Sequence, residues 1–552
     1  MNLLRFGLRF ASLALVLIGS SRLPADDGLV AHWKFAGDAK DSSKNALHAK
    51  NHGVDFVSSG PNENSHGGAR FDGRGQYLEV DDAKSLDVGT GNFSIAVWVH
   101  TEQSLDDLPG NLLSKYDPQS RRGFQLSIDS RPGVTSSQSN AGQLHFGIDN
   151  GKSEAKWTDH GRLGNAVLVY GMAVHDGQLF AGTCVPGNEA GRVYRFDGES
   201  WTDCGAPDAC NAVSSMAVFQ GDLYVGVSKY RLGGSSLAES ENPNLGGKVY
   251  RYVADGKWES CGSLPDVEAI NGMVVFRDKL YASSMYAPAG FFRYEGGTQW
   301  TSCGTPDGKR VEALGVYNGH IYASGYDEGA VYRYDGQSWA HMGLIEDATQ
   351  TYGFAVHHGE LYVSEWPHAK VYRFAGPDNW GFAGRAGEEK ETMPLAVYNG
   401  KMYVGTLPTG EVYRFDNGPT WTQVGRLDFT PDVRYRRVWS MAVFQGRLFA
   451  GALPSGRVHS IEVGKNVTHD HALRPGWRHI AAVKGDDQLS LFVDGKLVSR
   501  SSKFDATDFD LSNDQPLKIG FGAQDYFNGR LRDLRIYSRA VDPQEIAELA
   551  GK

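Results

Sequence analysis

The chain has 552 residues, of which 41% are hydrophobic, and its formal net charge is −10 at pH 7. Its length and apolar content are sufficient for at least two hydrophobic cores. The sequence has no run rich in lysine or arginine. Since binding to a nucleic acid backbone needs clustered cations, the composition argues against nucleic acid as a partner.

The first 25 residues predict a secretory signal peptide. Arg5 and Arg9 precede an apolar run over residues 10–19, and Leu23-Pro-Ala follows before Asp26. Charged, apolar and small residues in this order are typical of cleaved leaders, and the apolar run is short for a membrane span. We therefore expect a secreted, periplasmic or cell-surface protein with no membrane span after cleavage, and an uncleaved anchor is the alternative.

Residues 26–150 predict β-strands, because apolar and polar side chains alternate without a longer repeat. The segment ends on Leu144-His-Phe-Gly-Ile-Asp-Asn-Gly and does not contain enough strands for a complete sandwich. Its characteristic phrases are Gly28-Leu-Val-Ala-His-Trp-Lys-Phe, Asp41-Ser-Ser-Lys-Asn, Phe71-Asp-Gly-Arg-Gly-Gln-Tyr-Leu-Glu-Val and Phe93-Ser-Ile-Ala-Val-Trp-Val.

Residues 151–465 repeat three phrases in a fixed order. One copy reads Met172-Ala-Val-His-Asp-Gly, Val193-Tyr-Arg-Phe-Asp-Gly and Trp201-Thr-Asp-Cys-Gly. Each unit predicts four short strands joined by turns that contain glycine or asparagine. A period of about 40 residues built from such units is typical of a β-propeller.

The order of the phrases predicts how the ring closes. The first Trp phrase, Trp157 to Gly161, precedes the first inner strand, and no Trp phrase follows the last one. We therefore predict seven blades, with residues 157–161 as the outer strand of the last blade, which leaves few exposed sheet edges. An open array of β-units is the alternative.

The Tyr-Arg-Phe-Asp-Gly and Trp phrases resemble those of kelch-like propellers. The sequence departs from that family where a Gly-Gly pair would end the second strand, since it has Ala181-Gly182, Val225-Gly226 or Ala282-Ser283 there. The resemblance therefore implies a fold and no particular activity.

The first residue of each innermost strand is expected to line the mouth of the central channel. The repeat varies at this position, as a ligand-facing surface permits. Aromatic rings with an amide and a carboxylate suit a sugar or another flat ligand, and the loop over residues 229–247 is long enough for a lid. A plug without a ligand is the alternative. The predicted ligand-binding residues are Tyr170, Ser214, Asn271, Glu312, Tyr352, Met393 and Trp439, with Trp366 in a nearby loop.

All five cysteines lie in the repeat segment. Cys204, Cys261 and Cys303 occupy equivalent positions in different repeats, and one blade width is too far for a disulfide. Cys184 and Cys210 fall in loops on one face and are the predicted disulfide pair. Buried free thiols are the alternative.

Residues 466–552 return to strand alternation without the repeat, and Asp542-Pro-Gln-Glu predicts the start of a short helix. Together with the phrases of residues 26–150, this segment resembles the laminin-G-like, concanavalin A-like jelly roll, in the order of that family. The propeller is therefore predicted to be inserted in a loop of the jelly roll, which is tolerated when the ends of the guest lie close together. The phrases are Trp477-Arg-His-Ile-Ala-Ala-Val, Leu491-Phe-Val-Asp-Gly-Lys-Leu-Val and Phe527-Asn-Gly-Arg-Leu-Arg-Asp-Leu-Arg-Ile-Tyr.

The resemblance to the jelly roll also implies a structural Ca²⁺ ion held by oxygen ligands. The matching positions are Asp38, Asp41, Asn45 and Asp533. Aspartates in such a loop are equally typical of turns in which the side chain bonds its own backbone.

The expected molecule is an all-β protein, a laminin-G-like jelly roll interrupted by a seven-bladed propeller. Its leading predicted function is non-enzymatic recognition of carbohydrate or a glycosylated surface. A protein-interaction scaffold without a small ligand is one alternative. A polysaccharide-active enzyme with the jelly roll as targeting module is the other, and it would need a second carboxylate near Glu312.

Overall fold

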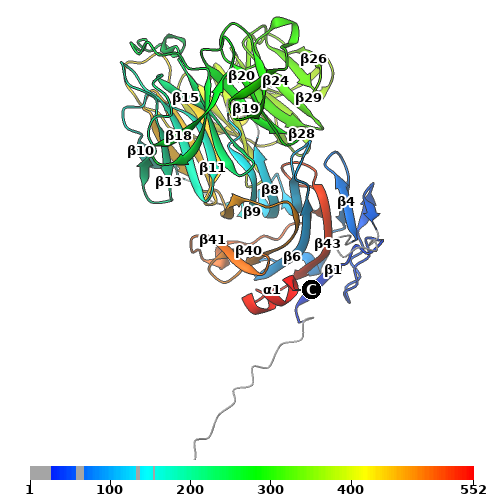
Figure 1. The fold of residues 1–552 in the computed structure, drawn as a ribbon. Helices are drawn as coiled ribbons and strands as arrows, with labels where there is room; N and C mark the ends of the chain where they lie inside the picture. The colour runs from blue at the N-terminus through cyan, green and yellow to red at the C-terminus, as the bar shows by residue number, and fades with distance from the viewer. Residues whose placement is uncertain (1–26, 58–66, 132–136, 153–155, 552) are drawn as a thin grey trace, which may run out of the picture.

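The computed structural model describes residues 27–57, 67–131, 137–152 and 156–551, and Figure 1 shows a ring of small sheets stacked on a two-sheet sandwich. In these ranges the only α-helix is α1 (Pro543–Ala550), so the prediction of an all-β protein is confirmed. No helix in the described part of the chain is long and apolar enough to cross a membrane. The predicted signal peptide, residues 1–25, lies outside the described residues.

The first sheet of the sandwich, here called the β6 sheet, has the strand order β3-β4-β43-β6-β39-β40-β41, and β1 pairs with β43. Strands from both ends of the chain alternate in it, because β6 lies between β43 and β39. Its strands are β1 (Leu29–Trp33), β3 (Asp55–Val57), β4 (Gly68–Asp72), β6 (Phe93–Thr101), β39 (Gly476–Lys484), β40 (Leu489–Val493), β41 (Lys496–Arg500) and β43 (Asn528–Tyr537).

The second sheet, here called the β8 sheet, has the order β2-β5-β42-β7-β8-β9-β38. Alternate side chains of both sheets fill the core between them, as the sequence pattern predicts; Phe93 and Val97 of β6 are buried, as are Leu126 and Phe146 of the β8 sheet. Burial of each such side chain contributes about 1.5–3 kcal/mol. The strands are β2 (Lys50–His52), β5 (Tyr77–Val80), β7 (Gly110–Asp117), β8 (Arg122–Arg131), β9 (Asn140–Asn150), β38 (Lys465–Ala472) and β42 (Leu517–Ile519).

The chain leaves the sandwich for the ring and returns to it at neighbouring strands. β9 is the last sandwich strand before the ring and β38 is the first after it, and the two pair antiparallel with Ile148 opposite Lys465. The ring segment therefore begins and ends at one edge of the β8 sheet.

Five sheets of the ring have four strands each in the described ranges, and eight further strands form one sheet. The sequence predicts seven blades, and this division of the strands into sheets does not confirm that number. The two halves of the eight-stranded sheet meet at one residue pair, Cys184 with Ala212, because β12 extends far enough to reach the first residue of β15. Its strands are β11 (Leu168–His175), β12 (Gln178–Cys184), β13 (Val193–Phe196), β14 (Trp201–Asp203), β15 (Ala212–Phe219), β16 (Asp222–Ser228), β17 (Lys248–Ala254) and β18 (Lys257–Ser263).

The first strands of the units contact one another in a closed cycle, from β11 through β15, β19, β23, β27, β31 and β35 back to β11. The four-stranded sheets are β19 (Ile270–Phe276), β20 (Lys279–Ser284), β21 (Phe291–Gly296) and β22 (Gln299–Ser302); β23 (Ala313–Tyr317), β24 (His320–Ser324), β25 (Ala330–Tyr334) and β26 (Trp339–Leu344); β27 (Gln350–His357), β28 (Glu360–Trp366), β29 (Lys370–Gly376) and β30 (Asn379–Arg385); β31 (Glu391–Tyr398), β32 (Lys401–Leu407), β33 (Glu411–Phe415) and β34 (Trp421–Arg426); and β35 (Arg437–Phe444), β36 (Arg447–Leu453), β37 (Arg457–Ile461) and β10 (Thr158–Arg162).

The last of these sheets contains the predicted interlock. Its outer strand is β10, from the start of the ring segment, and Thr158 of β10 lies opposite Ser460 of β37. The tight turns between strands are formed as the sequence predicts, since Asp176 and Gly177 both have positive φ in the turn between β11 and β12. The sequence thus specifies both the hairpins and the closure.

A segment of the sandwich reaches into the ring and holds the two parts together. Residues 137–139 precede β9, and the Gln138 backbone N–H donates to the Met216 carbonyl at 2.9 Å. The Val174 backbone N–H donates to the Ser139 carbonyl at 2.9 Å. Because Met216 and Val174 belong to the innermost strands β15 and β11, the segment contacts the innermost strands of two neighbouring units of the ring.

The predicted disulfide between Cys184 and Cys210 is not formed, and all five cysteines are free. Cys184 packs into the cluster that contains Trp439, whereas Cys210 packs into a different cluster beside Cys204. The Cys210 thiol is directed to the Ala212 carbonyl oxygen, 3.6 Å away. Burial raises the pKa of Cys210 to about 12, so this thiol is protonated at neutral pH.

Candidate functional site

The structure brings most of the predicted mouth residues together at one end of the ring. Tyr170, Tyr352, Met393 and Trp439 belong to one buried cluster. The Tyr170 and Trp439 ring centroids are 4.9 Å apart, and the Tyr170 hydroxyl donates to Asn271 Oδ1 at 3.2 Å. These side chains come from different sheets, so the cluster spans the ring from one side to the other.

Ser214 and Trp366 are less central than predicted. The Ser214 hydroxyl donates to the Ile270 carbonyl at 2.5 Å, which joins the innermost strands of two neighbouring units. Trp366 is only partly buried at the margin of the cluster, with its ring centroid 6.4 Å from that of Tyr435. We therefore assign Ser214 a role in ring packing and place Trp366 at the rim.

The mouth is closed in this structure. The innermost-strand residues that the sequence predicts as ligand-binding are all at most 3% exposed. Part of the predicted lid covers them: the short 3₁₀-helix η2 (Leu232–Ser235) lies on the cluster, and both Leu232 and Ser235 are buried. The Tyr230 ring packs edge-on against Tyr170, at 5.2 Å between centroids. The role of these residues in ligand binding stays a prediction.

Polar contacts tie the lid to its surroundings. The Lys229 ammonium donates to the carbonyl of Ser240 at 3.1 Å and also to that of Asn242, so the two ends of the lid are joined. The Asn242 amide in turn donates to the Glu189 carbonyl at 2.8 Å, in the neighbouring unit. The Arg231 guanidinium lies 4.2 Å from the centre of the Tyr286 ring. A small number of polar contacts therefore holds the lid over the buried cluster.

A buried ion pair lies beneath the lid. Arg437 Nε is 2.8 Å from Glu391 Oε1, and the side chains are 7% and 1% exposed. The Arg437 guanidinium also lies 4.9 Å from the centre of the Trp439 ring and donates to the Ser235 hydroxyl at 3.3 Å. Sequence analysis did not find Glu391; the available signal was a charged residue at the start of the otherwise apolar strand β31.

Glu312 is the fully buried carboxyl of this cluster. The pKa of Glu312 is raised to about 8, mainly by burial and also by the charge of Glu391, while hydrogen bonds from Tyr326 and Asn271 act in the opposite direction. In the described part of the chain, neither oxygen of Glu312 accepts a hydrogen bond of standard geometry. Tyr326 and Glu391, which the sequence reasoning missed, thus lie with Glu312 in a buried polar group beside the aromatic rings.

The residues predicted to hold calcium form a turn instead of an oxygen cage. The Asp41 carboxylate accepts backbone N–H groups from His32, Ser43 and Leu47, each at 2.8 Å. Asp533 Oδ1 lies 2.5 Å from His32 Nε2.

The amide of Asn45 donates to the Val30 carbonyl at 2.8 Å, and Asp38 accepts the Lys40 N–H at 3.1 Å. Among the described residues no group of three His, Cys, Asp or Glu side chains is arranged to hold a metal ion. These four residues are arranged to stabilise a turn and not to coordinate a calcium ion, because the Asp41 oxygens already accept backbone N–H groups. The binding of a calcium ion at these residues stays a prediction.

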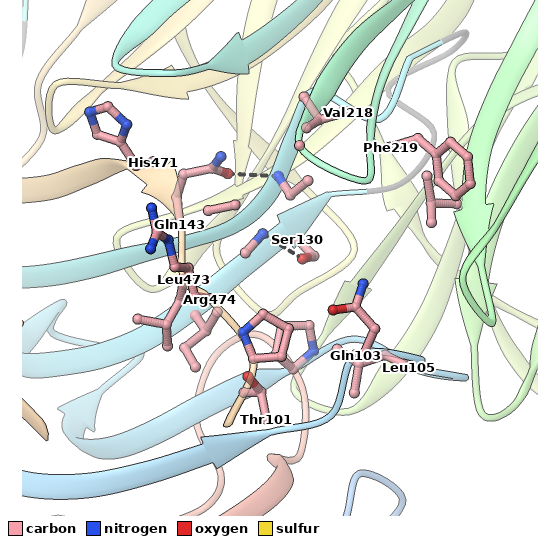
Figure 2. Close-up of a pocket in the computed structure, with 18 of the residues that line it drawn as sticks. Thr101, Gln103, Leu105, Ser130, Gln143, Val218, Phe219, His471, Leu473 and Arg474 are labelled. Atoms are coloured by element: carbon pink, nitrogen blue, oxygen red, sulfur yellow. Dashed lines mark hydrogen bonds between the residues drawn. The ribbon is translucent and has the colours of Figure 1, made fainter. Parts of the chain in front are cut away.

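A cleft of about 1050 Å³ separates the ring from the sandwich (Figure 2). Its ring side is made by the turns after β11 and β15, and its sandwich side by the end of β6 and by the chain around β9 and β38. Sequence analysis could not find it, because its walls come from segments far apart along the chain. Its labelled lining residues in Figure 2 are Thr101, Gln103, Leu105, Ser130, Gln143, Val218, Phe219, His471, Leu473 and Arg474.

The polar side chains of the cleft are held in place by local hydrogen bonds. Gln143 Oε1 accepts the Ala141 N–H at 2.6 Å, and the Ser130 hydroxyl accepts the Gly142 N–H at 2.9 Å. On the same wall, His471 of β38 lies next to Gln143, and His471 Nδ1 is 3.0 Å from Asp176 Oδ1, so this contact bridges sandwich and ring. These contacts orient the amide and hydroxyl groups toward a shared space.

Charges in the cleft are largely paired or neutral. Arg478 Nη1 lies 3.2 Å from Asp494 Oδ2, at the end of the cleft on the β6 sheet. Burial lowers the pKa of His469 to about 4, so this imidazole is neutral at physiological pH. The cleft therefore presents amides, hydroxyls and apolar carbon more than net charge.

Comparison with known proteins supports the sandwich. Residues 445–547 match the family described as the concanavalin A-like lectin/glucanases superfamily. The match spans β38 to β43 and begins in the last ring sheet. No curated protein matches the sequence of this chain. The chain thus contains a concanavalin A-like domain together with a propeller-like arrangement of small sheets.

Similar solved structures show distant likeness only. Virginiamycin B lyase from Staphylococcus aureus is 12% identical, with 56% of this chain and 99% of that chain covered and a TM-score of 0.43. The GH74 xyloglucanase from Xanthomonas campestris is 17% identical, with 60% of each chain covered and a TM-score of 0.41. Sqt1 from Saccharomyces cerevisiae is 11% identical, with 63% and 100% covered and a TM-score of 0.37. These values carry no argument about activity.

Proposed function

We propose that this chain is a carbohydrate-recognition protein that binds an oligosaccharide in the cleft between ring and sandwich. The observation that carries the proposal is the cleft itself, about 1050 Å³ in volume and lined by amide and hydroxyl groups beside apolar carbon. Ligand sites concentrate at junctions between structural units.

The chemistry of the lining suits sugars. Gln103, Gln138 and Gln143 bring amides, which donate and accept hydrogen bonds as sugar hydroxyls require. Phe219 and Leu473 bring apolar surface that matches the C–H face of a pyranose ring. The family match to a lectin and glucanase superfamily includes Leu473 and His471, which supports the same class of ligand.

Recognition is favoured over hydrolysis by the state of the acidic groups in the cleft. Glycoside hydrolysis normally uses two carboxyl groups about 5–10 Å apart on either side of the bond that is cleaved. Five acidic residues line the cleft, and three of them have a basic neighbour: Asp176 contacts His471, Asp494 contacts Arg478, and Glu102 lies 3.5 Å from Arg530. The other two are Asp278 and Asp107, and burial raises the pKa of Asp107 to about 7. We therefore propose a binding protein and treat a polysaccharide-active enzyme as the alternative.

We further propose the domain plan that these sites imply. Residues 26–150 and 466–552 form the jelly roll, residues 151–465 form an inserted propeller, and residues 1–25 direct secretion. The eight-stranded sheet counts as two blades joined at one pair, and the closed cycle of seven first strands supports a seven-bladed ring.

A glycan screen tests the proposal with matched variants. The tested variants are Gln103→Ala and His471→Ala, whose side chains line the cleft. The controls are Gln337→Ala and His341→Ala; His341 is exposed like His471 and has a comparable contact with an aspartate. We expect a bound glycan whose affinity falls at least tenfold in the cleft variants and is unchanged in the controls. A screen without any bound glycan, or equal affinity in all variants, would contradict the proposal.

A further inference from the structure

Another cavity lies between the ring and the sandwich, away from the cleft. It has a volume of about 340 Å³ and shares no lining residue with the cleft. Strands β7 and β42, with the residues beside them, form its sandwich side. The turns that carry His358 and Asn417 form its ring side. Sites for small molecules concentrate at such junctions and have volumes of about 300–1,000 Å³, so this cavity has room for a small ligand.

Hydrogen bonds across the junction fix the two sides of this cavity relative to each other. The His358 backbone N–H donates to the Ala523 carbonyl at 3.0 Å, and the Gly359 N–H donates to the Gln524 carbonyl at 2.9 Å. His357 Nδ1 lies 2.7 Å from the same Ala523 carbonyl oxygen. The cavity is therefore formed without a ligand, and little ordering of the chain opposes binding.

The lining of this cavity contains a lysine without a counter-ion. Among the described lining residues Lys518 of β42 carries a charge, and none is Asp or Glu. Lys518 forms no hydrogen bond or ion pair within the described ranges, and its ammonium group lies 5.0 Å from the centre of the Phe521 ring. Glu79 is opposite Lys518 in the neighbouring strand β5, but it forms no ion pair with Lys518 and does not line the cavity. Charges that are partly removed from water are normally paired, so an anion is the missing partner.

The charges around the cavity also favour an anion. The pKa of His358 is lowered to about 4, mainly by burial and also by the positive charges of Lys518 and Lys401. The His358 imidazole is therefore neutral at physiological pH. Asp416, the acidic neighbour of Lys401, is already engaged, since it lies 2.8 Å from Arg414 and 3.5 Å from Lys401. A ligand with a negative charge would thus meet free positive charge and no free carboxylate of the lining.

Polar donors and apolar carbon complete the lining. The side chains of Ser114, Asn417 and Gln515 carry hydroxyl and amide groups, which can donate hydrogen bonds. Pro516 and Phe521 contribute apolar carbon. One cation with neutral donors matches an anion with a single charge, whereas a doubly charged phosphate would exceed the charge of the lining.

We propose that this cavity binds a small organic molecule with one carboxylate, and that the Lys518 ammonium group is its counter-ion. An ammonium group and a carboxylate form charge-assisted hydrogen bonds, which are about twice as strong as neutral ones. The short apolar part of the molecule packs against Pro516 and Phe521. This inference is independent of the oligosaccharide proposed for the cleft, because the two sites share no lining residue.

Ligand-observed NMR on the full chain at pH 8 tests the inference with sodium butanoate as the probe. Three analogues of similar length replace the carboxylate: 1-butanol is neutral, butylammonium is cationic, and propylphosphonate is largely doubly charged at this pH. We expect saturation transfer to butanoate. We also expect its dissociation constant to be at least tenfold lower than that of each analogue.

A matched pair of lysine variants locates the bound carboxylate. In Lys518→Met, which keeps the length of the side chain and removes its charge, the affinity for butanoate should fall at least tenfold. The control is Lys496→Met in β41, because Lys496 is an exposed lysine of the sandwich that does not line the cavity. This control should leave the affinity for butanoate unchanged.

Each outcome decides the question. No binding of any probe, or equal affinity for butanoate and 1-butanol, would overturn the inference, because the negative charge would then not be recognised. Equal or tighter binding of propylphosphonate would also overturn it, as would unchanged affinity for butanoate in Lys518→Met. If Lys518→Met does not fold, the comparison of butanoate with its analogues on the native chain decides alone. Loss of sugar binding in the cleft variants affects none of these results.

Discussion

The side chain of Asn140 pairs with the backbone of Val443 as a β-strand would. Asn140 Nδ2 donates to the Val443 carbonyl at 2.8 Å, and the Val443 N–H donates to Asn140 Oδ1 at 3.0 Å. Both residues are buried, Asn140 as the first residue of the sandwich strand β9 and Val443 in the innermost strand β35 of the ring. The side-chain amide of Asn140, which belongs to the sandwich, therefore forms hydrogen bonds with both backbone groups of Val443 in the ring.

Replacement of Asn140 should uncouple the two parts. In Asn140→Leu the Val443 N–H and C=O lose their partners while buried, and each such loss costs about 1–3 kcal/mol. We expect a fall of about 2–5 kcal/mol in the free energy of unfolding, measured with urea. The exposed Asn379 in β30 provides the control, and Asn379→Leu should change stability by less than about 0.5 kcal/mol. Equal stability of both variants would contradict a coupling role for Asn140.

The pair of Arg437 and Glu391 predicts a strongly non-additive effect on stability. Removal of one partner leaves a buried charge uncompensated, which costs about 3–5 kcal/mol, whereas replacement of both is often neutral. We expect Arg437→Met to lower the free energy of unfolding by this amount and the double variant with Glu391→Leu to recover most of it.

An exposed ion pair provides the control for this comparison of single and double variants. Lys503 and Asp487 are 2.8 Å apart, with side chains 76% and 52% exposed. Lys503→Met should change stability by less than about 1 kcal/mol, because solvent screens such pairs. Additive effects of Arg437→Met and Glu391→Leu would show that the buried pair has no coupling energy.

Much of the fold could be predicted from the sequence because local patterns specify it. Apolar alternation predicts β6 and β39, and the repeated turns predict the ring hairpins. The interlock of β10 with β37 follows from the position of Trp157 before the first inner strand. The joining of two units at Cys184 and Ala212 could not be predicted, since it depends on where two strands end.

The candidate sites could be predicted less well. The first residue of each innermost strand varies between repeats, and this position correctly predicted that Tyr170 and Glu312 lie in one cluster. The prediction was possible because the innermost strands converge in any closed ring. The closure of this cluster by η2 depends on contacts of Tyr230 and Ser235 with residues far along the chain, which no local pattern reveals. The cleft could not be predicted for the same reason, since His471 and Asp176 come into contact only when the ring packs against the sandwich.

Thiol chemistry tests the cysteine assignment. Cys303 is partly exposed and the other cysteines are buried, and burial raises the pKa of Cys303 as well. Only thiolates react readily, so we expect at most one thiol to react with Ellman's reagent in the native protein at pH 8. In guanidinium chloride without a reductant, all five should react. A count of three would show that one disulfide is present, and it would return Cys184 with Cys210 as the predicted pair.

Buried carboxyls predict that stability falls as pH rises. Burial raises the pKa of Glu312 to about 8 and those of Glu365 and Asp107 to about 7. A carboxyl whose pKa is raised on folding stabilises the native state fully below its unfolded pKa. That stabilisation is lost as pH rises through the folded pKa. The affected window therefore runs from about pH 4.5 to pH 8 for Glu312.

Glu312→Gln isolates the largest of these contributions. Because glutamine does not titrate, the variant should lose less stability than the native chain between pH 5 and pH 8, and the difference should approach about 4 kcal/mol at most. The measurement is urea unfolding at intervals of half a pH unit, with Glu346→Gln as the exposed control. Parallel stability profiles for the native chain and Glu312→Gln would show that folding does not raise the pKa of Glu312.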